Sequence, residues 1–299
     1  MIKNIYDLNE IIKKQESKKK LVLAVAHDHH ALDAVYRAAQ KQIVDVALVG
    51  VEKEIYALAE KYNYDLSGFQ IIDEANKNKA VEISVKMVHD KEADILMKGN
   101  VGTGPLLKGV LNKEWGLRSG ELLSHHALFE AGAYHKLISM TDAAMNIAPD
   151  LKGKVSILRN SAGFLNKLGM ENPKVAVLGA VETVNDSMPA TLDAAILAKM
   201  NDRGQINGCI VDGPFAFDNA VSKESAKHKG IISEVAGDAD LLLLPDIEAG
   251  NVLYKSFVFF AKAKVAAVIL GATAPIVLTS RSDTEESKLN SILLAAAGQ

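Results

Sequence analysis

Alternation of strand and helix patterns is clearest in residues 21–50, which read LVLAVAHDHHALDAVYRAAQKQIVDVALVG. Leu21–Ala26 is an unbroken apolar run that predicts a buried strand, and the polar Asp28-His29-His30 leads into a helix. Val46–Val49 is a second apolar run, ended by Gly50. Two buried strands joined by a helix are typical of a βαβ unit, so this stretch predicts a parallel sheet with helices on its faces.

The same alternation continues to the end of the chain and predicts an α/β fold of mostly parallel sheets flanked by helices. It is preceded by residues 1–20, which are expected to form one amphipathic helix that ends in a solvated run of lysines, 18–20. Further helices are predicted at 52–62, 76–89, 155–168, 188–200 and 250–260, and further strands at 69–72, 95–97, 137–140, 175–178, 209–211, 241–244 and 265–270.

The bulk composition limits the kinds of partner. The chain has 299 residues, 48% hydrophobic and 24% charged, and a net charge of −3, so it has no field that would attract nucleic acid or an anionic membrane. Its one cysteine, Cys209, excludes an intrachain disulfide and provides no thiolate metal site. The first residues lack the apolar core of a signal peptide, and no apolar run reaches the length of a membrane span, so we expect a cytoplasmic protein.

A second informative stretch is residues 274–287, APIVLTSRSDTEES, in which a short strand is followed by a polar turn and a helix. Ser282 or Asp283 is expected to cap this helix, with two glutamates in its first turn, where the helix dipole favours negative charge. Ligands of open α/β sheets bind beyond the carboxyl ends of strands, so the hydroxyl of Ser280 and the guanidinium of Arg281 are candidates to bind phosphate or carboxylate. An ordinary capped helix with a surface arginine is the alternative.

Residues 98–104, KGNVGTG, follow a predicted strand and precede a short helix. Glycines such as Gly99 let a backbone approach a ligand closely, and free N–H groups there can cradle a phosphate, to which Lys98 would add charge. The spacing matches neither a Walker loop nor Gly-x-Gly-x-x-Gly, so neither a nucleoside triphosphate nor a dinucleotide is implied. A plain glycine-rich turn is the alternative.

Other polar residues are weaker candidates. Arg118 lies in a glycine-flanked turn and is a second possible anion ligand. Ser124 and His125 resemble a nucleophile and its base, but adjacent residues seldom align for that purpose, and the chain has no Gly-x-Ser-x-Gly elbow, so substrate binding is the role considered for both. The four polar residues at 27–30 favour helix capping over metal binding, and no metal site is predicted.

Three further candidates follow predicted strands. Asp212 comes at the end of one apolar run, and Asp246 and Asn251 come after another, where a helix begins. A sheet presents its ligand edge at such positions, so all three are candidate substrate-binding residues. A structural role as helix caps is the alternative for the two carboxylates.

Taken in order, several of these segments resemble the phosphate acetyl/butyryltransferase family. The shared segments are 96–99 (LMKG), 115–120 (WGLRSG), 123–125 (LSH), 211–218 (VDGPFAFD), 237–251 (GDADLLLLPDIEAGN) and 277–281 (VLTSR). Each is short, but their joint occurrence in this order is specific. The resemblance extends over nearly the whole chain from about residue 20.

The resemblance implies a two-domain fold of the isocitrate/isopropylmalate dehydrogenase type with a cleft between the domains. One domain would contain residues 1–137 and 268–299 and carry the Ser-Arg pair, and the other would contain 138–267 and form a homodimer or a higher homo-oligomer. It also implies reversible acyl transfer from a short-chain acyl-CoA to phosphate, nearest to the butyryl-transferring members. Coenzyme A and phosphate are the substrates, and neither a metal nor another cofactor is expected.

Within the resemblance, Ser280 and Arg281 correspond to the catalytic serine–arginine pair of the family. Related acetyltransferases use a carboxylate shortly after this pair as the base for the CoA thiol, and Glu286 and Asp283 are the candidates here. Acetyl-CoA as the substrate is one alternative, and non-catalytic binding of CoA or acyl phosphate is another. A decarboxylating dehydrogenase of the same fold is disfavoured because the chain lacks a dinucleotide fingerprint.

Overall fold

The computed structural model describes residues 2–278 and 283–299, and the chain divides into two compact units. Unit 1 consists of Met1–Ile5 and Leu122–Val265, and unit 2 consists of Tyr6–Glu121 and Ala266–Gln299. The boundary expected between residues 137 and 138 falls inside unit 1, between two of its strands, and the one expected after 267 falls close to the observed division. The last strand and helix therefore pack with the N-terminal half of the chain.

The sheet of unit 2 has the strand order β3-β2-β1-β4-β11-β10. Its parallel strands are β1 (Lys19–Ala24), β2 (Val44–Gly50), β3 (Gln70–Asp73), β4 (Ile95–Lys98) and β11 (Ile276–Val277), whereas β10 (Lys264–Leu270) is antiparallel to β11. Every residue of β1 from Leu21 to Ala24 is fully buried, as expected of a central parallel strand covered on both faces.

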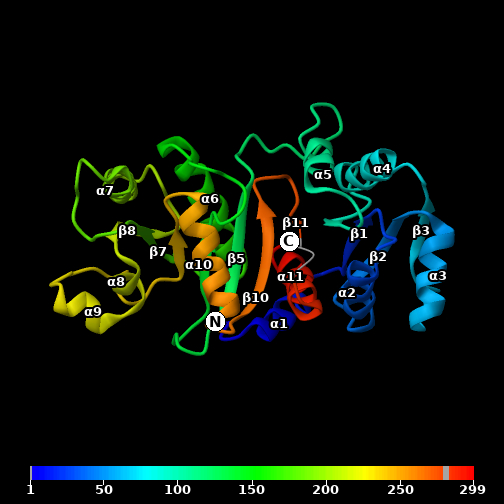
Figure 1. Ribbon diagram of the computed structural model, residues 1–299, viewed down its shortest axis with the longest axis horizontal. Coiled ribbons are helices and arrows are strands. Elements are labelled where there is room, and N and C mark those ends of the chain that lie inside the picture. The colour runs from blue at the N-terminus through cyan, green and yellow to red at the C-terminus, as the bar shows by residue number, and fades with distance from the viewer. Residues whose placement is uncertain (1, 279–282) are drawn as a thin grey trace. The chain divides into compact units, whose positions relative to one another are not determined.

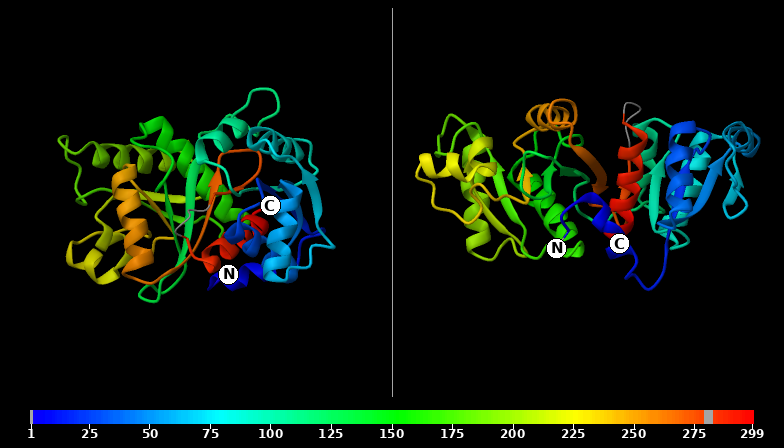
Figure 2. Two further views of the ribbon diagram at one scale, coloured as in Figure 1. Left: turned by 45° about the vertical axis from the view of Figure 1, so that its right-hand side comes forward. Right: turned by 90° about the horizontal axis from the view of Figure 1, so that it is seen from below.

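Helices cover both faces of this sheet. α2 (His29–Gln40) connects β1 to β2, α3 (Glu52–Tyr62) connects β2 to β3, and α4 (Lys77–His89) returns the chain from β3 to β4. Because such crossovers are right-handed, α4 lies on the opposite face of the sheet from α2 and α3. α5 (Thr103–Val110) packs on α4, and α11 (Glu285–Ala297) lies beside α2, as Figures 1 and 2 show. Every residue of α11 from Lys288 to Ala297 is buried, so this helix belongs to the core of unit 2.

The sheet of unit 1 has the strand order β5-β6-β9-β7-β8. β5 (Ser124–Glu130) is antiparallel to β6 (Ile138–Thr141), and the parallel part continues through β9 (Leu241–Leu243), β7 (Lys174–Leu178) and β8 (Ile210–Phe215). α6 (Leu151–Lys167) packs against β5, β6 and β9, and α7 (Pro189–Asp202) packs against β7 and β8. The remaining helices are α8 (Phe217–Val221), α9 (Lys223–His228) and α10 (Ile247–Phe259), and α10 lies along the outside of the unit (Figure 1).

The N-terminal segment differs from the sequence prediction. Instead of one helix over residues 1–20, it forms a 3-10 turn at Ile5–Asp7 and a short helix, α1 (Leu8–Ile12). Ile5 and Leu8 are fully buried, so the apolar side of the predicted helix does face a core. Lys19 and Lys20 belong to β1, where they pair with Val44 and Asp45, because ladder hydrogen bonds to β2 outweigh the local helical pattern.

Candidate active site

The carboxyl ends of β1, β4 and β11 form one edge of the unit 2 sheet. β11 is parallel to β4, with Ile276 opposite Leu96 and Val277 opposite Met97. The chain therefore enters the glycine-rich segment after β4 beside the point where β11 ends. Ser280 and Arg281 lie outside the described residues, but the strand that precedes them ends at this edge. Open α/β sheets bind ligands at such an edge.

Gly99 is required by packing at this edge. A Cβ on Gly99 would lie 2.3 Å from the carbonyl oxygen of Val25 and 2.7 Å from that of Ala24. The Gly99 N–H donates to the Ala24 oxygen at 2.9 Å, and the Asn100 N–H donates to the Val25 oxygen at 2.8 Å. The first N–H groups of the glycine-rich segment are thus used to join β4 to β1.

Two ammonium groups lie along the glycine-rich segment. Lys98 Nζ donates to the carbonyl oxygen of Val101 at 3.4 Å, and Lys77 Nζ donates to that of Asn100 at 2.9 Å. α5 then begins after Gly102 without a side-chain cap, so its first turn adds partial positive charge. The segment has the chemistry of an anion site, supplied by lysines and a helix end.

Arg118 is held by the turn that connects β10 to β11. It pairs with Ala272 as an isolated antiparallel bridge, and Thr273 N–H donates to the Leu117 oxygen at 2.8 Å. Ser119 Oγ donates to the carbonyl oxygen of Gly271 at 2.6 Å. The Arg118 side chain is exposed, and its backbone is anchored to the segment that precedes β11.

The cap of α11 differs from the prediction. Thr284 caps the helix by accepting a hydrogen bond from Ser287 N–H at 3.1 Å, in place of Ser282 or Asp283. Thr284 has an extended backbone, and the two glutamates fall in the first helical turn, as predicted. The N-cap is therefore one residue later than the sequence suggests, a shift that local propensity does not resolve.

The two candidate bases flank this cap. Glu286 is exposed, and its Oε1 accepts a hydrogen bond from the Tyr6 hydroxyl at 3.0 Å. The carbonyl oxygen of Asp283 accepts a hydrogen bond from Lys288 Nζ. Both residues thus lie at the N-terminal end of α11, where the helix dipole is positive.

Ser124 and His125 begin β5 and point to opposite faces of the unit 1 sheet, because successive strand residues alternate. Ser124 Oγ is buried and accepts a hydrogen bond from Asn160 of α6 at 3.0 Å. The His125 ring meets Tyr254 of α10 edge-on, with centroids 5.6 Å apart. The two side chains cannot act on each other, in agreement with the sequence argument against a serine nucleophile.

Asp142 is a polar residue at the carboxyl end of β6, in unit 1, that the sequence reasoning missed. It follows β6, is 3% exposed, and accepts hydrogen bonds from Ala144 N–H and Met145 N–H, both at 2.9 Å. A Cβ on Gly250 would lie 2.5 Å from its carbonyl oxygen, so α10 packs directly on this turn. Its only signal in the sequence was its place after a predicted strand.

Asp246, Asn251 and Asp212 all have structural contacts. Asp246 caps α10 by accepting from Ala249 N–H at 2.8 Å, and Asn251 Nδ2 donates to the Ala143 oxygen at 3.3 Å. Asp212 lies within β8 and not at its end, and it accepts from the N–H of its neighbour Gly213 at 2.8 Å. Of the three, Asp246 and Asn251 lie on the helix that contacts the Asp142 turn, whereas Asp212 does not.

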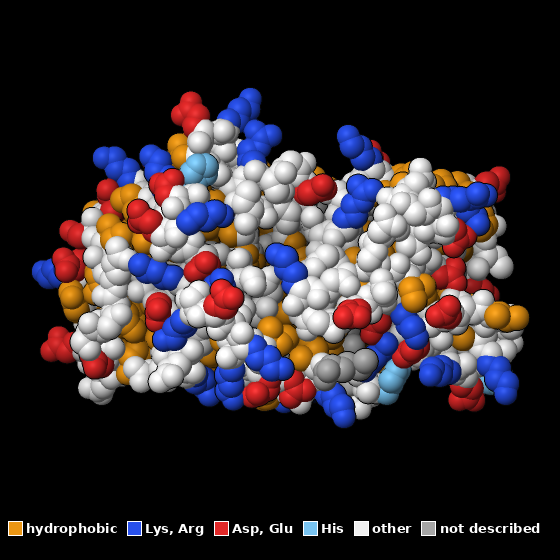
Figure 3. Space-filling model, turned by 180° about the vertical axis from the view of Figure 1, so that it is seen from behind, with side chains coloured by type: hydrophobic (Ala, Val, Ile, Leu, Met, Phe, Trp, Pro, Cys, Tyr) orange, Lys and Arg blue, Asp and Glu red, His pale blue; other side chains and the backbone are white. Residues whose placement is uncertain are grey.

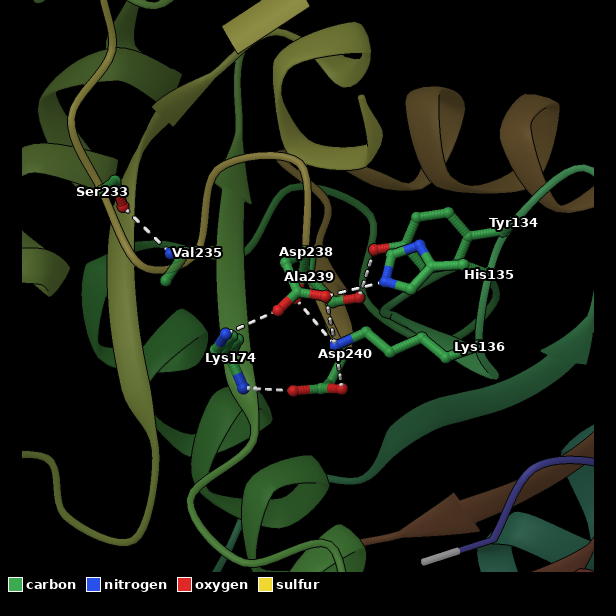
Figure 4. Close-up of polar contacts among 9 residues, drawn as sticks. All are labelled: Tyr134, His135, Lys136, Lys174, Ser233, Val235, Asp238, Ala239 and Asp240. Atoms are coloured by element: carbon green, nitrogen blue, oxygen red, sulfur yellow. Dashed lines mark hydrogen bonds and ion pairs between the residues drawn. The ribbon is translucent and has the colours of Figure 1, made fainter. Parts of the chain in front are cut away.

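A cluster of ion pairs lies at the opposite, amino ends of the unit 1 strands (Figure 4). Lys174 Nζ is 2.6 Å from Asp238, Lys136 Nζ is 2.6 Å from Asp240, and His135 Nε2 is 2.8 Å from Asp238. Burial is the largest single effect on the pKa of Asp238 and raises it, but hydrogen bonds from Lys174, His135 and Lys136 together hold this pKa below its ordinary value of 3.8. The cluster connects the starts of β6, β7 and β9, which is a structural role.

The charge distribution leaves anion recognition to individual side chains. Basic and acidic groups are interspersed over the face drawn in Figure 3.

Asp28 caps α2 by accepting from Ala31 N–H at 2.9 Å, which confirms the capping interpretation of residues 27–30. Within the residues that the structure describes, no group of three or more His, Cys, Asp or Glu side chains is arranged to hold a metal ion, and no helix is long and apolar enough to cross a bilayer.

A parallel α/β sheet with lysines and a helix N-terminus at its carboxyl edge defines a class of proteins that bind phosphorylated ligands there. The family model described as phosphate acetyl/butaryl transferase matches residues 6–85 and 74–296. The chain therefore belongs to the phosphate acetyl/butyryl transferase family, which confirms the resemblance found in the sequence.

Individual relatives agree with this assignment. The chain is 49% identical to a phosphate butyryltransferase of Clostridium acetobutylicum over 98% of both chains. It is also 49% identical to a phosphate acetyltransferase of Thermotoga maritima, over 93% of this chain and 94% of that one. A solved structure of a branched-chain phosphotransacylase from Enterococcus faecalis is similar, with a TM-score of 0.85, 32% identity, and coverage of 94% of this chain and 98% of that one. The predicted fold class is confirmed.

Proposed function

We propose that this protein catalyses reversible transfer of a butyryl group, or a related short acyl group, from coenzyme A to inorganic phosphate. The products are an acyl phosphate and free CoA. The observation that carries the proposal is the 49% identity with the butyryltransferase of Clostridium acetobutylicum over 98% of both chains. Coenzyme A and phosphate enter as substrates, and the proposal includes no resident cofactor.

The chemistry requires stabilisation of one developing charge. A phosphate oxygen attacks the thioester carbonyl carbon, the C–S bond of the tetrahedral intermediate breaks, and CoA leaves as a thiolate that takes up a proton. Negative charge develops on the former carbonyl oxygen, and removal of one donor aimed at such an oxygen typically costs about 2.7–4 kcal/mol. Holding both substrates together supplies much of the remaining rate.

The candidate residues have roles in this scheme. Arg281 would bind phosphate and neutralise the developing charge, and Ser280 would donate a hydrogen bond to the sulfur or to the oxyanion. Lys98 and Arg118 would hold substrate phosphate groups, since their backbones are fixed to β4 and to the β10–β11 turn. In the reverse direction Glu286 or Asp283 would accept the CoA thiol proton. Ser124, His125, Asp212, Asp246 and Asn251 remain candidates for substrate contact.

An assay of acyl-CoA consumption tests the proposal. Acetyl-, propionyl-, butyryl- and isobutyryl-CoA are each supplied with phosphate, and the released thiol is measured. We expect butyryl-CoA to have the highest kcat/KM. Arg281→Ala should lower kcat/KM about 10²–10³-fold, as loss of an oxyanion donor does. The matched control is Arg203→Ala, which removes an exposed arginine at the end of α7 in unit 1. Unchanged kcat/KM in Arg281→Ala would remove the central assignment.

Acetyl transfer is the second candidate. It is favoured by the 49% identity with the acetyltransferase of Thermotoga maritima. One methylene more or less changes discrimination by only about 1–3 kcal/mol, so a modest change in pocket volume separates the two activities. A kcat/KM higher for acetyl-CoA than for butyryl-CoA would favour this candidate.

A homodimer formed through α10 completes the proposal. The helix has Gly250 as its one buried residue, although its sequence is largely apolar. Val252 is 67% exposed, Phe259 is 60% exposed and Phe260 is 89% exposed. An apolar helix face of this kind normally lies against a partner, and a second copy of unit 1 is the partner that we propose.

Sedimentation measures this association. The double variant Val252→Glu/Phe259→Glu should sediment as a monomer at concentrations where the native protein is a dimer. Ile232→Glu is the control, because Ile232 is 100% exposed and lies outside α10. A native protein that is monomeric at micromolar concentration would exclude the dimer.

A further inference from the structure

A pocket of about 520 Å³ lies between α4, α5 and the turn at residues 112–115, entirely within unit 2. Small-molecule sites typically measure about 300–1,000 Å³ and combine an apolar lining with a few polar groups. Here the apolar lining includes Trp115, Val81 and Pro105, and the polar groups include Asn78 and Asn112. The acyl-transfer scheme makes no use of this pocket.

The backbone that carries Trp115 is held in place by its own turn. Asn112 Oδ1 accepts hydrogen bonds from the backbone N–H of Trp115 at 3.2 Å and from the backbone N–H of Glu114 at 2.8 Å. A Cβ on Gly116 would lie 2.4 Å from the Asn112 carbonyl oxygen, so the chain closes tightly just after the indole. Lys86 Nζ lies 5.7 Å from the centre of the ring. An aromatic platform that is fixed beforehand favours stacking of a planar ring.

The polar groups indicate which ring would fit. Because Asn112 Oδ1 already accepts two backbone hydrogen bonds, the amide nitrogen is the group that Asn112 can offer to a ligand. Asn78 carries an amide with both a donor and an acceptor, and Lys108 adds a positive charge to the lining. Glu82 also lines the pocket, and its carboxylate is paired with Lys86 Nζ at 2.6 Å. Adenine presents an N7 acceptor beside an N6 donor, a pair that an Asn amide matches.

We propose that this pocket binds the adenine ring of an adenosine phosphate, stacked on Trp115, with its phosphate toward Lys108 and the first turn of α5. Two sources share this chemistry. One is the adenosine end of coenzyme A, and in that case the inference rests on the proposed function. The other is a free adenine nucleotide such as AMP, which would make the pocket a regulatory site of its own.

The experiment uses the fluorescence of the full-length protein, because Trp115 is the one tryptophan in the chain. AMP, adenosine 3′,5′-bisphosphate and CoA are titrated separately, with excitation selective for tryptophan. Phosphopantetheine and inorganic phosphate are the controls without adenine. We expect a saturable fluorescence change with the adenine ligands and none with the controls, with calorimetry as an independent measure of binding.

Gly104→Leu adds a bulky side chain at the lining of the pocket. Gly104 lines the pocket, and a Cβ there would have nothing within 4 Å, so the added side chain enters open space without a clash. We expect the Kd for AMP to rise at least about tenfold, in line with loss of base stacking. Gly163→Leu in α6 is the matched control, since it also lies in a helix with nothing within 4 Å of an added Cβ.

Competition separates the two sources. If CoA displaces AMP, and Gly104→Leu raises the KM for acyl-CoA without raising that for phosphate, the pocket holds the adenosine end of the substrate. If AMP binds and CoA does not displace it, the pocket is a separate nucleotide site. The proposal fails if no adenine ligand binds, or if binding is equal in the native protein and Gly104→Leu. If the enzyme transfers acyl groups but no adenine ligand binds, the adenine pocket is refuted and the proposed function stands. If the protein is inactive but binds AMP in a Gly104-dependent way, the proposed function is refuted and the adenine pocket stands.

Discussion

Replacement of Gly99 by alanine would separate packing from ligand contact in the glycine-rich segment. The added Cβ would lie 2.3 Å from the Val25 oxygen, whereas ordinary contacts begin at 3.4 Å, so the end of β4 must move from β1 by about 1 Å. That movement stretches the hydrogen bonds from Gly99 to Ala24 and from Asn100 to Val25, now 2.9 and 2.8 Å long.

The expected loss of stability follows from these contacts. Overpacking costs about 1–3 kcal/mol, and each weakened backbone hydrogen bond contributes a net of about 1 kcal/mol. A combined loss of about 3–5 kcal/mol lowers Tm by roughly 6–20 °C in a unit of this size. Gly104→Ala is the control, because an added Cβ there meets nothing within 4 Å and alanine favours the helix. Its Tm should stay within about 3 °C of the native value.

Calorimetry and kinetics together distinguish a packing role of Gly99 from a ligand contact. Scanning calorimetry measures the Tm of the native protein and both variants, and phosphate titrations at fixed butyryl-CoA measure the KM for phosphate. We expect Gly99→Ala to change substrate binding only together with Tm. A variant with the native Tm and a raised KM for phosphate would refute the packing account and make Gly99 a ligand-contact position.

Three further predictions concern charge and burial. Because the folded pKa of Asp238 is lowered, its contribution to stability is complete above the unfolded pKa and is lost as the pH falls through the folded one, so Asp238→Asn should be less stable at pH 7 and lose less on acidification below about pH 4. Urea midpoints across this range measure the effect, and parallel curves would contradict it. Lys154 and Asp193 form an ion pair at 2.5 Å with side chains 7% and 23% exposed. Asp193→Ala should cost about 3–5 kcal/mol in urea unfolding, and Lys154→Met/Asp193→Leu should recover most of it; equal losses would argue against a buried pair. Burial raises the pKa of Cys209 to about 11, so a disulfide reagent should modify it at pH 8 far more slowly in the native protein than in urea, and equal rates would show an accessible thiol.

The order of strands and helices can be predicted from the sequence because each element has its own short-range pattern of apolar and polar residues. The helix predicted at 52–62 is observed over the same residues, as Glu52–Tyr62, and the apolar runs near 21 and 46 are β1 and β2. A buried strand needs a local run of apolar residues whichever neighbour it pairs with. The α/β class and the family membership could therefore be predicted from the sequence, and Lys98, Arg118 and Asp246 could be named as candidate residues.

Contacts between distant segments have no such local pattern. β11 enters the sheet between β4 and β10, which brings residue 276 beside residue 96, and this pairing explains why a late strand ends at the glycine-rich segment. The same kind of contact places Gly99 against the carbonyl groups of residues 24 and 25, and it places Lys19 in β1 instead of in the predicted helix. Hydrogen-bond partners and close approaches depend on which surfaces meet after the chain returns on itself, and only the folded molecule holds that information.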